Sequence, residues 1–167
     1  MKKFLGILTA FFLAVFTTSC LESNLEDLPE FSDKNITGLN NVYYRYISDE
    51  VHPGTGANKV KQVRIPNGVW TVVKNDDEAG EAEATFVIQF SQSFEQFKGK
   101  LDMSKDICVY VNLSQGAICE PIEGSAVLGA PGDWSKPNKY KVTAADGSVK
   151  IWTLKIDQIF NPHYVGL

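Results

Sequence analysis

The stretch KYKVTAADGSVKIWTLKI, residues 139–156, places the strongest constraint on the fold of this chain. Two runs of alternating apolar and polar residues flank Asp146-Gly147, a dipeptide that accepts the positive φ angles of a tight β-hairpin turn. Because side chains of a strand point alternately to its two faces, the apolar residues of each run share one face. These residues are Tyr140, Val142, Ala144, Trp152, Leu154 and Ile156. The lysines fall mostly on the other face: Lys139, Lys141, Lys150 and Lys155.

One face of this hairpin is thus expected in a core and the other in water, as two packed antiparallel sheets require. Similar strand patterns recur between Pro- and Gly-containing breakers at residues 35–47, 59–65, 68–74, 84–91, 106–113, 116–122, 139–145 and 148–156. No segment carries an apolar stripe of helical period over three turns. Residues 93–102 alone could hold a short helical turn, or form an irregular crossover. The sequence predicts an all-β chain, an antiparallel β-sandwich of about seven to eight strands.

The chain begins with the pattern of an export signal. Lys2 and Lys3 precede an uninterrupted run of apolar or small residues, 4–16, and polarity returns at Thr17. A transmembrane helix needs about 20 apolar residues, so this run is too short to span a bilayer. A positive start followed by a short apolar region is typical of a secretory signal that is removed. We expect residues 1–19 to be such a signal peptide.

Thr17, Thr18, Ser19 and Cys20 resemble the lipobox of bacterial lipoproteins, although Thr17 stands where that pattern usually has leucine. The resemblance implies that Cys20 is lipidated and becomes the first residue of the mature protein. Each buried methylene of an acyl chain contributes about 0.8 kcal/mol, so several chains would hold the protein on a membrane. An ordinary signal peptide cleaved near Ser19, which leaves a free thiol, is the alternative.

Residues 20–34 are acidic and contain no basic residue before Lys34. This segment resembles the surface-export tether of Bacteroidetes lipoproteins, and its low hydrophobicity is equally typical of a solvated spacer. The predicted organisation is a signal peptide (1–19), a flexible tether (20–34), one β-sandwich domain (35–160) and a C-terminal tail (161–167).

Two further segments carry a family resemblance. NLSQGAICEPIEGS (112–125) and GDWSKPNKYKVTAADGSVKIWTLKI (132–156) resemble Ig-like, cadherin-like β-sandwich domains of Bacteroidetes surface lipoproteins. The resemblance implies an Ig-like fold and a lipid-anchored location on the outer membrane, exposed at the cell surface. Some such domains belong to glycan-capture systems, but many have no assigned activity.

The charge and the cysteines exclude or restrict other roles. A net charge of −4 argues against nucleic acid as a ligand, because its phosphates require a basic face on the protein.

Cys108 and Cys119 could form a disulfide in an exported protein, or remain two buried thiols. If 106–113 and 116–122 form a hairpin around residues 114–116, Cys108 lies nearer Ile122 than Cys119. That register stretches the Cα separation that a disulfide permits.

Residues able to do catalytic chemistry are few. His52 lies in a Pro-Gly loop and His163 near the C-terminus, and we find no nucleophile elbow, P-loop or zinc pattern. We therefore expect no enzyme and no cofactor. The acidic loop at 75–83 offers Asp76, Asp77 and Glu78 as calcium ligands, although its spacing is not that of an EF-hand. Charged loops between strands are more often only solvated, so no metal site is predicted.

Aromatic and polar residues on strands suggest a ligand surface, because sugar rings stack on aromatic faces. In VYYRYI, alternation places Tyr44 and Tyr46 on one face of the strand and Tyr43 with Arg45 on the other. If the first pair is core, Tyr43 and Arg45 are exposed and, with Trp70 beside a turn, are our ligand-binding candidates.

We therefore expect a non-catalytic, membrane-anchored module that contacts glycan or peptide near outer-membrane uptake machinery. The alternative is an assembly subunit that pairs with a protein partner through a sheet edge.

Overall fold

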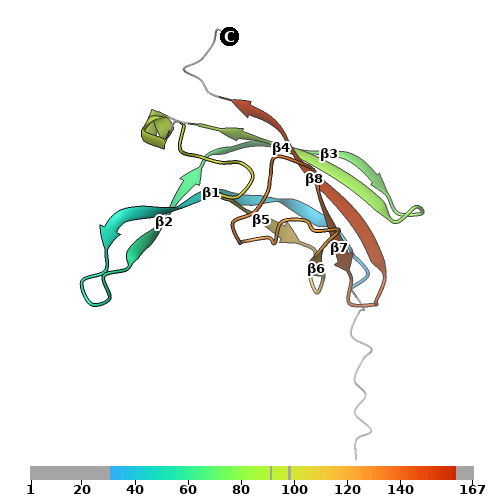
Figure 1. The fold of residues 1–167 in the computed structure, drawn as a ribbon. Helices are drawn as coiled ribbons and strands as arrows, with labels where there is room; N and C mark the ends of the chain where they lie inside the picture. The colour runs from blue at the N-terminus through green and yellow to red at the C-terminus, as the bar shows by residue number, and fades with distance from the viewer. Residues whose placement is uncertain (1–30, 91, 98, 161–167) are drawn as a thin grey trace, which may run out of the picture. The chain divides into compact units, whose positions relative to one another are not determined.

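The computed structural model describes residues 31–90, 92–97 and 99–160 (Figure 1). Their elements are β1 (Ile36–Val51), β2 (Asn58–Ile65), β3 (Asn67–Asp76), β4 (Glu81–Gln89), η1 (Gln92–Phe97), β5 (Ile107–Leu113), β6 (Ile118–Ile122), β7 (Asn138–Thr143) and β8 (Val149–Phe160). Each predicted strand is present, and the segment that could hold a helical turn contains the 3₁₀ helix η1. No helix in the described ranges is long and apolar enough to cross a membrane.

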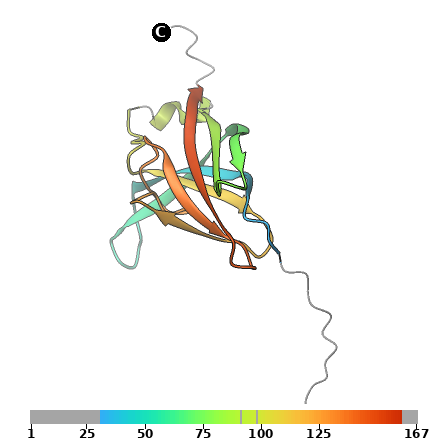
Figure 2. The same ribbon diagram turned by 90° about the vertical axis from the view of Figure 1, so that its right-hand side faces the viewer.

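The strands form two sheets, one of three strands in the order β2-β1-β5 and one of five in the order β3-β4-β8-β7-β6 (Figures 1 and 2). The all-β sandwich that the alternation predicted is confirmed. One pair differs from the antiparallel expectation, because β4 and β8 run parallel from Glu81↔Ile151 to Gln89↔Phe160. The other paired strands are antiparallel.

The core lies between the two sheets and contains the side chains that the β7–β8 hairpin was expected to bury. Tyr140, Val142 and Leu154 are fully buried, as is nearly all of Trp152. Aromatic rings from other elements fill the centre: Phe86 of β4 contacts Trp134, with ring centroids 5.8 Å apart. Alternation within β7 and β8 therefore assigns their inward faces correctly, whereas two bulges in the first half of β1 let Ile36, Leu39 and Val42 all contact the core.

Lys150 departs from the expected solvent-facing lysines. It shares the parity of Trp152 and Leu154 in β8, so its side chain points inward, and it is fully buried. Its ammonium donates to Asn75 Oδ1 at 2.7 Å and Asn35 Oδ1 at 3.1 Å, and it pairs with the Asp77 carboxylate. A buried charge is tolerated only when it is paired in this way. Asn75 lies at the end of β3, Asp77 in the turn after β3, and Asn35 just before β1.

The main chain just before β1 is held by several elements, an arrangement we call the N-terminal clamp (Lys34, Asn35, Ser114, Lys150 and Trp152). Trp152 Nε1 donates to the Lys34 carbonyl at 3.0 Å. Ser114 N donates to the Asn35 carbonyl at 2.9 Å, and Asn35 N donates to Ser114 Oγ at 3.1 Å. The last residues of the predicted tether are therefore bound to the sandwich, while residues 20–30 lie outside the described part of the chain.

The long connection between β6 and β7, residues 123–137, runs beside β5. Gly129 N donates to the Val109 carbonyl at 2.8 Å, and Gly132 N donates to the Ile107 carbonyl at 3.0 Å. These bonds cover the edge of β5 that β1 does not occupy, and sheet edges left open are prone to pair with other chains.

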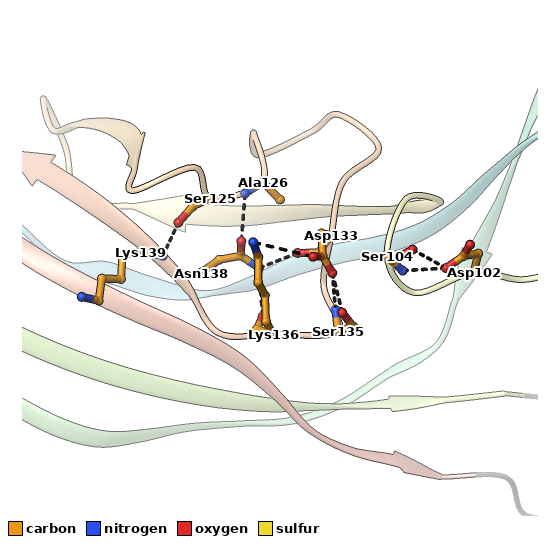
Figure 3. A network of polar contacts seen from close by, with 9 residues as sticks. All are labelled: Asp102, Ser104, Ser125, Ala126, Asp133, Ser135, Lys136, Asn138 and Lys139. Atoms are coloured by element: carbon orange, nitrogen blue, oxygen red, sulfur yellow. Dashed lines mark hydrogen bonds and ion pairs between the residues drawn. The ribbon is translucent and has the colours of Figure 1, made fainter.

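Asn138, at the start of β7 and fully buried, holds this connection in place (Figure 3). Its Oδ1 accepts from Ala126 N at 2.8 Å, and its Nδ2 donates to the carbonyls of Asp133 at 2.9 Å and Lys136 at 3.2 Å. One side chain thus satisfies three main-chain groups of the connection.

Two turns share the pattern Asp-x-Ser-Lys, at residues 102–105 and 133–136, which the sequence analysis did not detect. Asp102 Oδ1 accepts from Ser104 N at 2.9 Å and Ser104 Oγ at 2.6 Å, and Asp133 makes the same bonds with Ser135 at 3.0 and 2.6 Å (Figure 3). Hydrogen bonds from Ser104 and from Lys105 lower the pKa of Asp102 from 3.8 to about 2. Bonds from Ser135 lower the pKa of Asp133.

The lowered pKa values of these aspartates predict that the folded protein loses stability in acid. A carboxylate whose pKa is lower in the folded state adds stability above its unfolded pKa, near 3.8 here, and loses it as pH falls through the folded pKa. Asp77 and Asp146 are shifted in the same direction. We expect the urea midpoint to fall steadily from about pH 4 to pH 2, the window set by these pKa values. A midpoint that stays constant over this window would contradict the prediction.

Candidate binding site

A cavity of about 780 Å³ lies between the second half of β1, η1 and the loop before β5. We call it the tyrosine cavity. Residues that line it include Tyr44, Tyr46, Glu50, Phe97, Lys100 and Asp106. Figure 2 shows η1 at the same end of the sandwich as the last residues of β8. The cavity therefore belongs to one end of the sandwich, where β1 continues beyond its pairing with β5.

Three aromatic rings form one wall of the cavity. Tyr44 and Tyr46 are alternate residues of β1 and stack with centroids 5.1 Å apart and planes at 14°. Phe97 of η1 contacts both, at 5.3 Å from Tyr44 and 5.0 Å from Tyr46. Tyr44 is buried, as one reading of the alternation predicted, but Tyr46 is only half-buried. Tyr46 is therefore the tyrosine of this wall that a ligand meets first.

Charged groups surround the aromatic wall. Glu50 pairs with Lys61 and, at 3.5 Å, with Lys59, and these contacts lower the pKa of Glu50. Asp106 Oδ2 accepts from Asp102 N at 3.0 Å. Burial, followed by the nearby Asp106 charge, raises the pKa of Tyr44. The cavity thus offers phenol hydroxyls, carboxylates and the exposed Lys100 around a stacked aromatic surface.

Tyr43 and Arg45 lie on the other face of β1, close to one another. The Tyr43 ring packs edge-on against Tyr110, with centroids 5.6 Å apart. Arg45 donates to Gln62 Oε1 from Nε at 3.2 Å and from Nη2 at 2.9 Å. Both predicted residues are half-buried on a surface of the three-stranded sheet.

Trp70 does not join them. It lies in β3, in the other sheet, opposite Phe86, and the two rings stack with centroids 6.4 Å apart. Trp70 is partly buried and packs against the core. The three ligand candidates from the sequence thus divide into one surface pair and one residue at the core boundary.

The residues considered for calcium make contacts within the protein. Asp76 Oδ1 accepts from Ala79 N at 2.8 Å, and Asp77 pairs with Lys150, which lowers the pKa of Asp77. Glu78 is exposed. In the part of the chain that the structure describes, no group of three or more His, Cys, Asp or Glu residues is arranged to hold a metal ion.

The two cysteines lie in different sheets, and both are free thiols. The hairpin considered around residues 114–116 is not formed: β5 pairs with β1, β6 pairs with β7, and the turn passes between sheets. Burial, followed by the Glu120 charge, raises the pKa of Cys119 to about 11, so its thiol is protonated at neutral pH. Burial also raises the pKa of Cys108.

The other predicted positions are His52, which is exposed in the loop between β1 and β2, and Cys20 and His163, which lie outside the described residues.

The tyrosine cavity could not be found from the sequence, because the cavity depends on how η1 packs over β1. A usable signal was present: Phe94 and Phe97 are aromatic residues in the segment that could hold a helical turn.

Comparisons with known proteins agree with this fold. A model of the family described as DUF5018-related matches residues 36–155. A crystal structure of a "putative secreted protein" from Bacteroides fragilis is 35% identical, with a TM-score of 0.54. The match covers 80% of this chain and 98% of that one. No curated protein matches the chain.

Proposed function

The chain belongs to the DUF5018-related family, and from this premise we propose that it is an exported, non-catalytic module that binds a saccharide in the tyrosine cavity. The observation that carries the proposal is the wall of Tyr44, Tyr46 and Phe97 in a cavity of about 780 Å³. Ligand sites commonly measure about 300–1,000 Å³ and combine aromatic walls with a few polar groups.

The chemistry of the cavity suits a sugar ring. The apolar C–H face of a sugar packs on an aromatic ring, and the half-buried Tyr46 supplies such a ring. Sugar hydroxyls need donors and acceptors around that ring, which Asp106, Glu50 and Lys100 supply at the cavity. Glu50 is already paired with two lysines, so it serves better as an acceptor than as a proton donor.

Export and anchoring are part of the same proposal. The related Bacteroides fragilis protein is described as putatively secreted, which supports removal of residues 1–19. We propose that Cys20 then carries the lipid and that residues 20–30 connect it to the sandwich at the outer membrane surface. The packing of two sheets is compatible with the Ig-like, cadherin-like relationship that the sequence suggested.

The position of the cavity fits an anchored binder. The N-terminal clamp holds the start of β1, whereas Tyr46 lies in its second half (Figure 1). At about 3.3 Å per residue, the stretch from Ile36 to Tyr46 spans roughly 30 Å. Tyr46 is therefore well separated along β1 from the N-terminal clamp, so contacts at the clamp leave the cavity accessible.

We expect Tyr46→Ala to weaken saccharide binding at least tenfold, because it removes the accessible ring of the wall. The test is a glycan array with the soluble mature chain from Leu21, followed by calorimetry with the best neutral oligosaccharide. Tyr46→Phe keeps the ring and should change affinity by less than about threefold, which is under 1 kcal/mol. Tyr43→Ala, on the other face of β1, is the matched control and should leave this binding unchanged. No saturable binding, or equal losses in Tyr46→Ala and Tyr43→Ala, would refute the proposal.

A second candidate is assembly with a protein partner along β2, an edge strand of its sheet. The observation in its favour is that Ile47 and Val60, direct neighbours across β1 and β2, are 71% and 63% exposed. If this role holds, Val60→Lys should abolish co-purification with one defined partner and leave saccharide binding intact, because Val60 does not line the tyrosine cavity.

A further inference from the structure

We propose that the outer face of β1 and β2 is a second binding surface, selective for polysaccharides that carry carboxylate groups. This surface, the arginine face, consists of Tyr43, Arg45, Gln62 and Arg64. It lies on the opposite side of β1 from the tyrosine cavity, and its ligand need not be the saccharide proposed for that cavity.

The strand register brings the two arginines together around one aromatic ring. Tyr43 pairs with Arg64, and Arg45 pairs with Gln62, in antiparallel β1 and β2. Arg45 and Arg64 are therefore diagonal neighbours, at a separation of roughly 7–8 Å between backbones. Arg64 and Gln62 are exposed, and Tyr43 and Arg45 are half-buried. The surface is part of a sheet face, which suits an extended polymer better than a small enclosed ligand.

Contacts on the protein side fix the geometry of this surface before any ligand arrives. Gln62 Oε1 accepts two hydrogen bonds from Arg45, which orient the guanidinium. Tyr43 packs edge-on against Tyr110, and the Tyr110 hydroxyl donates to the Gly129 carbonyl at 3.2 Å. Side chains already held in position lose less conformational entropy on binding.

The charge of the arginine face is not neutralised within the protein. Among the residues described, neither Arg45 nor Arg64 forms an ion pair, whereas Lys59 and Lys61 of the same hairpin both bind Glu50. Two uncompensated guanidiniums on one face of a chain with net charge −4 mark a place where an anion is favoured.

The residue types select the kind of anion. A guanidinium binds a carboxylate through two parallel hydrogen bonds, and Arg64 can bind one in this way. On the adjacent strand, Arg45 uses Nε and Nη2 to hold Gln62 and offers its charge and its other nitrogen, Nη1, to a second carboxylate. Tyr43, which lies opposite Arg64 and two residues before Arg45, supplies a ring for the C–H face of a sugar. A nucleic acid would need a larger basic footprint than two arginines. A polysaccharide with one carboxylate on each sugar matches the aromatic ring and both cations.

The experiment compares retention of the soluble mature chain on polygalacturonate and on neutral galactan, by affinity gels and calorimetry at low and high salt. We expect the double variant Arg45→Gln, Arg64→Gln to bind polygalacturonate at least tenfold more weakly. The matched control is Lys139→Gln, Lys141→Gln, with the same change of charge on two lysines of β7 that are paired with Glu123 and Glu120. The control should stay within about twofold of the wild type, a difference of about 0.4 kcal/mol. Melting curves establish that each variant is folded.

Three results would overturn the proposal. The first is no retention of the wild type by polygalacturonate at low salt, including the case where it binds only phosphatidylglycerol vesicles. The second is an equal loss in the Lys139 and Lys141 control, which would show attraction by overall charge. The third is an equal loss of polygalacturonate affinity in Tyr46→Ala, which would show that this polysaccharide binds in the tyrosine cavity. Polygalacturonate binding that survives Tyr46→Ala supports the arginine face whatever the outcome for the cavity.

Discussion

Replacing Phe86 with alanine is expected to lower the free energy of unfolding by about 4 kcal/mol, the usual cost of removing a buried aromatic ring. Phe86 is fully buried in β4 and contacts Trp70 and Trp134, whose ring centroids lie 6.4 and 5.8 Å away. Both neighbours are large and held by other contacts, so they cannot move fully into the space left behind. Urea unfolding followed by tryptophan fluorescence measures the change.

Phe31→Ala is the matched control for this prediction. Phe31 is 41% exposed, so its loss should cost less than about 1 kcal/mol. A loss below about 1.5 kcal/mol in Phe86→Ala would mean that the two sheets repack around the missing ring. That result would contradict the rigid aromatic centre described above.

Asn138→Ala is expected to cost about 3 kcal/mol, because it leaves Ala126 N and the carbonyls of Asp133 and Lys136 without their partner. The variant should also aggregate more readily, since the connection that covers the edge of β5 loses its attachment. Urea unfolding gives the first effect, and light scattering of the native protein gives the second.

An exposed asparagine provides the comparison. Asn112 lies on β5 and accepts one side-chain bond from Asn40 at the surface, so Asn112→Ala should change stability by less than about 0.5 kcal/mol. If Asn138→Ala were as mild as this control, the three hydrogen bonds of Asn138 could not be what fixes the connection.

The strands and their inward faces could be predicted because alternation is a local property. The β7–β8 hairpin needs only Asp146-Gly147 and its flanking residues to define both faces. The parallel pairing of β4 with β8 could not be predicted, because those strands lie far apart in sequence. The turn after β5 was ambiguous for a related reason: a short turn can close a hairpin or cross to the opposite sheet.

Lys150 shows where residue type misleads. Its parity placed it with Trp152 and Leu154, yet a lysine is rarely buried without a partner. The partners Asn35, Asn75 and Asp77 come from the residue before β1, the end of β3 and the turn after β3, and no local pattern connects them.

The candidate sites were predictable to different degrees. Alternation separated Tyr43 and Arg45 from Tyr44 and Tyr46, and this division holds in β1. Trp70 was assigned to a ligand surface because it follows a turn, but its parity in β3 directs it toward Phe86. The tyrosine cavity required knowledge of η1, whose Phe97 packs on both tyrosines across a long stretch of chain.

The N-terminal clamp also decides how this domain carries mechanical load. Tension applied before Phe31 meets the sandwich first at the Phe31 carbonyl, which accepts from Ala145 N at 3.0 Å. It then meets Lys34 and Asn35 and passes into β1, the central strand of its sheet. Force along β1 acts first on its hydrogen bonds to β5, whose pairing begins at Ile36, and then also on those to β2, whose pairing begins at Val42. The rate of forced unfolding depends on the height of the energy barrier to breaking these hydrogen bonds. The clamp therefore makes the hydrogen bonds of a central strand, rather than those of an edge strand, the first resistance to a pull on the residues before β1.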